Sequence, residues 1–198
     1  MSKNIALFDK FFIGYSIPQI GKEFDLLRID KETVVNIEIK KKSTKEKIIA
    51  QLSKNKYYLN FLKRNTYCCT YVSDEKKLYT LYDTENLEEV DLTQLLNMLA
   101  SQSVAKINNL DIYFNPSNYL VSPFNSTQEF INGAYFLTTH QERIENEILK
   151  QLKLSGYSIL SIKGGAGTGK TLLTYDIAKK VLRKKEVLVI HCGQLNKG

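Results

Sequence analysis

Two carboxylates and a lysine near the start of the chain are spaced in a way that suits metal-assisted chemistry. Asp25 lies in one apolar segment, and Glu38 and Lys40 lie in the next. Both segments are rich in apolar and β-branched residues and are joined by a polar turn at residues 30–32, which predicts a β-hairpin. A hairpin that turns symmetrically there places Asp25 opposite Glu38 and Glu23 opposite Lys40. Because side chains alternate between the faces of a strand, all four share one face.

Carboxylates that face each other across a hairpin repel, because their Cβ atoms lie only ~4.5–5.5 Å apart. A divalent cation between Asp25 and Glu38 removes that repulsion, and Mg²⁺ favours one or two carboxylates together with water and substrate oxygens. Such an ion lowers the pKa of a water molecule and stabilises charge on a phosphate. Lys40 can orient that water or stabilise the transition state, and the carbonyl of Ile39 is a natural further ligand. The alternative is a surface hairpin with ordinary charges.

These residues resemble the motif of the PD-(D/E)xK nuclease superfamily, including the nuclease-related domains that are fused to helicases. By this resemblance Asp25 is the motif aspartate, Glu38 the second acid and Lys40 the lysine, and Gln51 stands where several members place a glutamine near the metal. The resemblance covers residues 5–81 and extends to about residue 99. Two features depart from the pattern: phenylalanine replaces the proline before Asp25, and no upstream glutamate is obvious, with Glu23 and Asp9 as the only substitutes.

A glycine-rich segment near the end of the chain fits the Walker A pattern. It comprises Gly164, Gly165, Ala166, Gly167, Thr168, Gly169, Lys170 and Thr171. An apolar segment precedes it and an apolar-periodic helix follows, which is the context that a phosphate-binding loop requires. Backbone N–H groups and the start of the helix would hold the β- and γ-phosphates of ATP. Lys170 would reach their oxygens, and the Thr171 hydroxyl would ligate Mg²⁺.

The residues upstream of this loop resemble the adenine-recognising element of superfamily 1 helicases. Gln141, in the segment 137–141, would read the edge of the adenine; the alternative is a helix cap with exposed polar residues. The stretch from Leu137 to about Leu195 resembles the start of a helicase ATPase domain, most of all those of bacterial helicase-like ATPases that carry an N-terminal nuclease. A second acidic metal site, a water-positioning residue and an arginine finger have no room here. We therefore expect an N-terminal fragment of a longer protein.

The charge of the chain favours a polyanionic partner. The formal net charge is +7 and the isoelectric point is about 9.1. Seven lysines and two glutamates lie between residues 38 and 56, running from the acid pair onto the next predicted helix. The candidates for phosphate contacts are Lys41, Lys42, Lys45 and Lys47. The alternative is a solvated helix face.

Composition excludes several other classes of protein. No apolar run approaches the ~20 residues of a membrane span, and no signal peptide is recognisable. The three cysteines, Cys68, Cys69 and Cys192, form neither a disulfide framework nor a spaced zinc pattern. Buried strand thiols are the expected state of the vicinal pair, and the reducing cytoplasm is the expected location.

The elements that must position these residues form two expected α/β units. The first, residues 1–120, is a small mixed sheet with flanking helices, and residues 121–136 form a linker. The second, residues 137–198, is the start of a parallel P-loop domain. Strands are expected at 24–29, 33–40, 67–72, 77–81, 159–162 and 187–190. Helices are expected at 45–62, 92–99, 139–154 and 169–183, with a capping box at Thr139–Glu142 for the third.

The function expected from these patterns is Mg²⁺-dependent cleavage of DNA, coupled to an ATP-binding motor in DNA processing, restriction or defence in a bacterium. Three alternatives remain open. The nuclease fold could be an inactive platform that docks DNA for the ATPase. The substrate could be RNA, because these motifs read phosphates rather than sugars. The acid pattern could also be accidental on an interaction domain.

Overall fold

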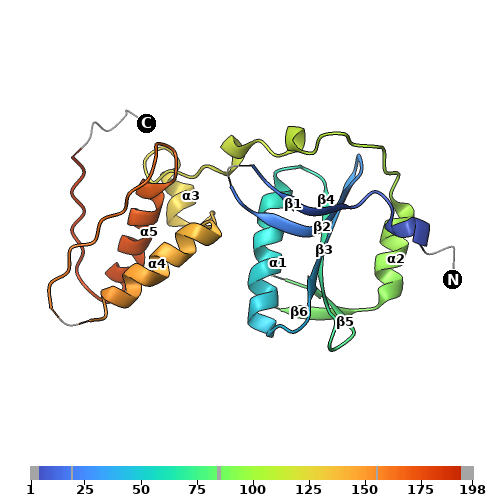
Figure 1. Ribbon diagram of the computed structural model, residues 1–198, viewed down its shortest axis with the longest axis horizontal. Coiled ribbons are helices and arrows are strands. Elements are labelled where there is room, and N and C mark those ends of the chain that lie inside the picture. The colour runs from blue at the N-terminus through green and yellow to red at the C-terminus, as the bar shows by residue number, and fades with distance from the viewer. Residues whose placement is uncertain (1–4, 19, 84–85, 155, 193–198) are drawn as a thin grey trace. The chain divides into compact units, whose positions relative to one another are not determined.

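The chain folds into two compact units, residues 1–118 and residues 119–198. The computed structural model (Figure 1) describes residues 5–18, 20–83, 86–154 and 156–192. The boundary lies close to the end of the expected first domain, and the expected linker contributes a short helix, α3 (Thr127–Ile131), to the second unit.

The first unit is built on a mixed six-stranded sheet in which each strand pairs with its sequence neighbour. The strands are β1 (Phe12–Ser16), β2 (Glu23–Ile29), β3 (Thr33–Lys40), β4 (Asn65–Val72), β5 (Lys77–Leu81) and β6 (Leu87–Val90). Only β3 and β4 are parallel, and the connection between them is α1 (Lys45–Asn60); all other neighbours are antiparallel. A parallel pair needs such a crossover, because a short turn cannot return the chain to the same end of the sheet. The expected mixed α/β architecture is confirmed.

Helices cover the sheet of the first unit on both faces (Figure 1). The first of them, α1, begins after Thr44, whose hydroxyl caps the helix by accepting a hydrogen bond from the N–H of Lys47. The second, α2 (Leu92–Ser101), packs Leu95 and Leu99 on the other face, against a core cluster that includes Val35, Ile37 and Cys69. Side chains of β3 therefore alternate between two buried environments. The side chains of Asn36 and Glu38 point toward α1, so the polar residues of this strand are buried between the sheet and that helix.

The segment after α2 returns along the β1–β2 edge of the sheet. It contains two 3₁₀ turns, η2 (Asp111–Tyr113) and η3 (Pro116–Tyr119); a third such turn, η1 (Ile5–Phe8), begins the unit. Phe114 is 1% exposed and packs its ring 5.2 Å from that of Tyr15 and 6.2 Å from that of Phe24. This aromatic cluster fixes the end of β2 on which Asp25 lies.

The described part of the second unit is helical. Its main helices are α4 (Thr139–Gln151) and α5 (Lys170–Leu182), which bury Leu173 and Ile177 with Leu137. The expected capping box was wrong by one residue. The N-cap is Thr138, which is in extended conformation. Thr138 and Gln141 form the capping box by exchanging hydrogen bonds, in place of the expected pair of Thr139 and Glu142.

The two strands expected in the second unit are not formed. Residues 159–162 and 187–190 are in coil, and their apolar side chains face solvent: Ile159 is 100% exposed and Leu188 84%. Ile162 is the partial exception, because it packs against the cluster of Leu137, Leu173 and Ile177. Both segments have strand composition, but a strand is stable only when a neighbour satisfies its backbone groups, and the described residues of this unit contain no strand. The end of the helicase-like stretch, near Leu195, lies outside the described residues.

The cysteines are free, as expected. Cys68 and Cys69 are buried in β4, and burial raises the pKa of the Cys68 thiol to about 12. Cys192 is exposed. Among the helices formed by the described residues, none combines the length and apolar character needed to cross a membrane.

Truncating Phe114 should destabilise the first unit strongly. Phe114→Ala should lower the free energy of unfolding by about 3–5 kcal/mol, because it empties a buried ring site beside Phe24. Urea denaturation of the full chain measures the change. The matched control is Ile112→Ala in the preceding turn, where the side chain is 72% exposed. Equal, small effects of both variants would contradict the packing described for Phe114.

Candidate functional site

The register of the β2–β3 hairpin is the one expected from a symmetric turn. Leu26 pairs with Ile37, Leu27 with Asn36, and Ile29 with Val34. Asp25 and Glu38 lie one step beyond the Leu26–Ile37 pair and on the same face. The β2–β3 pairing ends at Leu26 and Ile37, so the expected pair of Glu23 with Lys40 is not formed; Glu23 pairs with Ser16 on the β1 side and is exposed.

Lys40 brings the two carboxylates together. Its ammonium Nζ lies 3.2 Å from Oδ2 of Asp25 and 3.3 Å from Oε2 of Glu38. Burial lowers the pKa of Lys40, but Glu38 and Asp25 outweigh burial, so its pKa lies above the ordinary value. The three residues expected to share a site therefore do so, around one point at the end of the β2–β3 hairpin. We call this group of Asp25, Glu38 and Lys40 the acid site.

Asp25 is also held by the backbone of the neighbouring strand. The N–H of Ile39 donates a 2.8 Å hydrogen bond to Oδ2 of Asp25. Burial raises the pKa of Asp25, but this hydrogen bond and the Lys40 ammonium more than offset it, so the pKa lies below its ordinary value. In a strand the N–H and C=O of one residue point to the same side. The Ile39 carbonyl, expected as a metal ligand, therefore points toward β2 as well.

Glu38 is buried and its other oxygen is fully engaged. Only 1% of the residue is exposed, and Oε1 accepts hydrogen bonds from Nδ2 of Asn55 at 2.9 Å and Nδ2 of Asn36 at 3.3 Å. Gln51 was expected near the metal. Its Nε2 donates a hydrogen bond to Oδ1 of Asn55 at 3.1 Å, so Asn55 lies between Gln51 and Glu38. Sequence reasoning missed Asn36 and Asn55. Their positions were readable in part, since Asn36 is two residues before Glu38 on one strand face, and Asn55 is one helical turn after Gln51.

A second lysine, Lys22, is buried at the edge of this site and was also missed. It is 7% exposed, its ammonium lies 4.4 Å from the centre of the Phe24 ring, and it donates a hydrogen bond to the carbonyl of Glu23. Burial lowers its pKa to about 8, although Glu38 and Asp25 act in the opposite direction. Nothing in the spacing of Lys22 indicated burial, because lysine in a polar segment ordinarily lies in solvent.

The described residues offer two carboxylates for a metal, not three. They contain no cluster of three or more histidine, cysteine, aspartate or glutamate side chains placed to hold an ion. The two substitutes for the absent upstream acid, Glu23 and Asp9, are both exposed. Mg²⁺ can nevertheless be held by one or two carboxylates with water and substrate oxygens, and Asp25 and Glu38 supply that number.

The lysines proposed for phosphate contacts surround the end of β3. Lys41 and Lys42 follow the strand, and Lys45 and Lys47 lie in the first turn of α1; all four are exposed. Lys42 pairs with Asp74 at 3.6 Å, an exposed ion pair that phosphate can displace at little cost. The positive charge therefore lies next to Lys40 in the chain and is open to solvent.

The glycine-rich loop of the second unit is closed on itself by hydrogen bonds. Nζ of Lys170 donates to the carbonyls of Gly164 at 2.9 Å and Gly165 at 2.6 Å, and the hydroxyl of Thr168 also donates to Gly165, at 2.9 Å. Gly169 precedes α5 with a φ of 76°, a left-handed conformation that glycine adopts without strain. The loop thus precedes a helix as a phosphate site requires, and Thr171, the expected Mg²⁺ ligand, is exposed in the first turn of α5.

Gln141 connects the start of α4 with this loop. Its Oε1 accepts from the N–H of Thr138 at 2.9 Å, and its Nε2 donates to the carbonyl of Thr168 at 3.1 Å. A Cβ on Gly169 would lie 2.4 Å from that Nε2, so only glycine leaves room for the contact. Gln141 therefore caps α4 and also contacts the glycine-rich loop. To form a hydrogen bond with an adenine ring, its side chain would have to give up one of these two hydrogen bonds.

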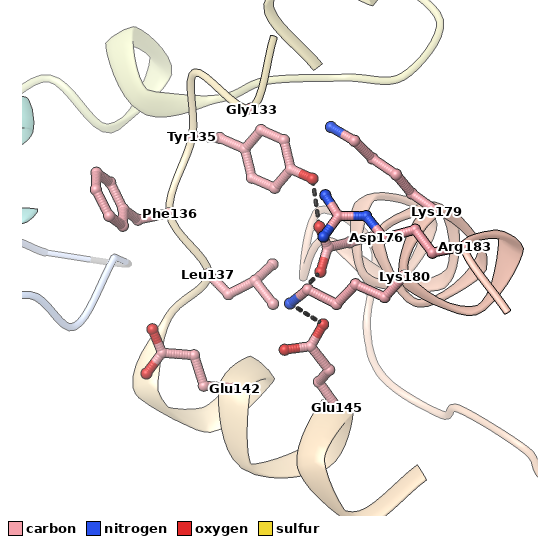
Figure 2. A pocket seen from close by; sticks show the side chains of 10 residues that line it. All are labelled: Gly133, Tyr135, Phe136, Leu137, Glu142, Glu145, Asp176, Lys179, Lys180 and Arg183. Atoms are coloured by element: carbon pink, nitrogen blue, oxygen red, sulfur yellow. Dashed lines mark hydrogen bonds and ion pairs between the residues drawn. The ribbon is translucent and has the colours of Figure 1, made fainter. Parts of the chain in front are cut away.

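A pocket of about 280 Å³ lies in the second unit between α4, α5 and the segment before α4 (Figure 2). Lys180 pairs there with Glu145 and, at 3.0 Å, with Asp176, while the hydroxyl of Tyr135 donates to Asp176 (Figure 2). Burial raises the pKa of Glu145, whereas hydrogen bonds lower that of Asp176 despite its burial. The charges of this cluster satisfy one another and tie α4 to α5.

Burial of Lys22 predicts a pH-dependent stability. The unfolded chain keeps the Lys22 proton up to about pH 10.5, whereas the folded chain loses it near pH 8. The contribution of Lys22 to the free energy of unfolding therefore rises with pH between these two values. Lys22→Met should therefore stabilise the chain at pH 7 by roughly 3 kcal/mol. That gain should disappear as the pH approaches 10.5. Urea denaturation of both proteins at pH 7 and pH 10, with a chelator present, measures it; the same difference at both pH values would contradict the assignment.

In comparisons with known protein families, with curated proteins and with solved structures, the chain has no match. A function is therefore proposed from the chemistry of the acid site and of the glycine-rich loop.

Proposed function

We propose that the first unit cleaves DNA phosphodiester bonds with the help of Mg²⁺ or Mn²⁺. The observation that carries this proposal is the convergence of Asp25 Oδ2 and Glu38 Oε2 on the Lys40 ammonium, at 3.2 and 3.3 Å. Two carboxylates that approach one cation-binding point, with a lysine beside them, form the combination that metal-assisted hydrolysis of a phosphodiester needs. The resemblance to PD-(D/E)xK nucleases agrees with this chemistry.

The residues of the acid site fit a hard divalent cation. Asp25, Glu38 and the carbonyl of Ile39 would hold it, since Mg²⁺ takes oxygen ligands and needs few of them from protein. Asp25 is held ionised by its hydrogen bond from Ile39, which keeps it available as a ligand. When bound, the ion would supply an activated water and charge neutralisation at the scissile phosphate.

The remaining steps belong to side chains of the chain itself. Lys40, released from the two carboxylates, would place its ammonium against the attacking water or the phosphate oxygens, where negative charge develops. Lys41, Lys42, Lys45 and Lys47 would contact neighbouring phosphates, fixing the strand without reading its sequence. Such contacts favour any polyanion, so DNA is preferred here on the resemblance and the net charge of +7 rather than on a base-reading group.

The second unit would bind ATP at the loop that precedes α5. Lys170 would exchange its bonds to Gly164 and Gly165 for the β- and γ-phosphates, and Thr171 would ligate the accompanying Mg²⁺. ATP binding of this kind would couple cleavage to a helicase-like motor in DNA processing, restriction or defence.

A second candidate is a DNA-docking platform without catalysis. It is favoured by one observation: the Lys40 ammonium bridges both carboxylates, which relieves their repulsion without a metal ion. Cleavage assays separate the two candidates.

Removal of the Lys40 ammonium should abolish metal-dependent cleavage. Linear, circular and single-stranded DNA are incubated with the full chain and Mg²⁺ or Mn²⁺, and Lys40→Ala is expected to lower the rate by about a hundredfold or more. The control is Lys31→Ala, at the exposed turn of the same hairpin, which should cut at the original rate. Equal activity of both variants would remove Lys40 from the mechanism. No cutting by the unaltered chain, with DNA binding intact, would favour the docking platform.

Lys170→Ala should weaken ATP binding by about tenfold or more, because it removes a charged hydrogen-bond donor from the phosphates. Isothermal titration of the full chain with Mg²⁺ and ATP measures the affinity. Lys163→Ala is the matched control, since Lys163 is exposed immediately before the loop. An affinity that is unaltered by Lys170→Ala would reject the phosphate-loop assignment.

A further inference from the structure

Three polar side chains are sealed in the layer between β3 and α1. Asn36 and Asn55 are 0% exposed and Glu38 is 1% exposed, in a layer otherwise filled by residues such as Leu52 and Leu59 of α1. Burying a carboxylate and two amides is costly unless every one of them is hydrogen-bonded. Here each is bonded to another, so the group forms a connected network rather than isolated polar atoms.

The network engages one oxygen of Glu38 and leaves the other facing the acid site. Nδ2 of Asn55 donates to Oε1 of Glu38 at 2.9 Å and to Oδ1 of Asn36 at 2.6 Å. Nδ2 of Asn36 donates to the same Oε1 at 3.3 Å and to the carbonyl of Leu26 at 3.1 Å. Glu38 Oε1 thus receives two amide donors. Oε2 is the oxygen that faces Lys40.

We propose that Asn55 and Asn36 are positioning residues of the acid site, which hold the Glu38 carboxylate with Oε2 turned toward the ion. This inference rests on the proposed function, in which Glu38 is a metal ligand. Partners of this kind orient a ligand that they do not replace, and their loss typically weakens metal binding by about 10–100-fold.

Gln51 acts through Asn55. An asparagine amide can present either its oxygen or its nitrogen, and the choice follows from its neighbours. Nε2 of Gln51 donates to Oδ1 of Asn55 at 3.1 Å, which leaves Nδ2 to face Glu38. Gln51→Leu removes that donor without adding charge, so the Asn55 amide should lose the bond that helps to fix its orientation toward Glu38. The glutamine expected at the metal would therefore be an orienting group two hydrogen bonds away from it.

The test is the affinity of the full chain for Mn²⁺, with Asn55→Leu beside Asn60→Leu. Asn60 is an exposed residue of the same helix, so the control makes the same substitution outside the network. Asn55→Leu should weaken Mn²⁺ binding by about tenfold or more, whereas Asn60→Leu should leave it unchanged. In cleavage assays at one Mn²⁺ concentration, Asn55→Leu should lower kcat with little effect on KM for DNA, because the phosphate-contacting lysines are untouched.

A second variant keeps the test decisive if Asn55→Leu fails to fold. Gln51 is only half-buried, and Gln51→Leu should also weaken Mn²⁺ binding, while circular dichroism and the urea midpoint confirm the fold. Unchanged Mn²⁺ affinity in folded Asn55→Leu or Gln51→Leu would overturn the positioning role and leave the nuclease proposal standing. A wild-type chain that neither binds Mn²⁺ nor cuts DNA would overturn the proposed function and the positioning role together.

Discussion

The burial of the Glu38 carboxylate is the constraint on which the acid site depends. A charge with 1% exposure must be surrounded by donors or counter-charges, because an uncompensated buried charge destabilises a fold by several kcal/mol. Asn36 and Asn55 donate hydrogen bonds to one of its oxygens, and the Lys40 ammonium pairs with the other. Asn36 and Asn55 lie inside the layer between the sheet and α1, and Lys40 lies at the edge of that layer. Glu38 is consequently both a buried structural group and the carboxylate that faces Lys40.

This arrangement explains why β3 lies where it does in the sheet. The strand is covered by α2 on one face and by α1 on the other, so Asn36 and Glu38 join a polar network on the α1 side while Val35 and Ile37 build an apolar core on the α2 side. A one-residue slip would exchange the two sets and bury the polar residues among leucines. The packing of both helices thus enforces the register that brings Asp25 beside Glu38.

The hairpin was predictable from sequence because strand periodicity and a symmetric turn fix which residues meet. The same reasoning placed Lys40 beside the two carboxylates, and apolar periodicity after the glycine-rich loop predicted the helix that forms there. It missed Asn55 and Lys22, since their burial results from how α1 and the β1–β2 edge pack, which no local pattern encodes. It also failed for residues 187–190, where strand composition is present but a neighbouring strand is not among the described residues. Local propensity predicts elements well, and partner-dependent features poorly.

The most direct test of a metal-binding acid site is to locate the ion. Crystals of the full chain grown with Mn²⁺ would be measured near the manganese absorption edge, and an anomalous difference map would be calculated. A binding site formed by Asp25 and Glu38 predicts a peak within bonding distance of Asp25 Oδ2 and Glu38 Oε2, with the Lys40 ammonium displaced from its present contacts with both. A map without a peak at saturating Mn²⁺, with Lys40 still bridging the two carboxylates, would contradict it.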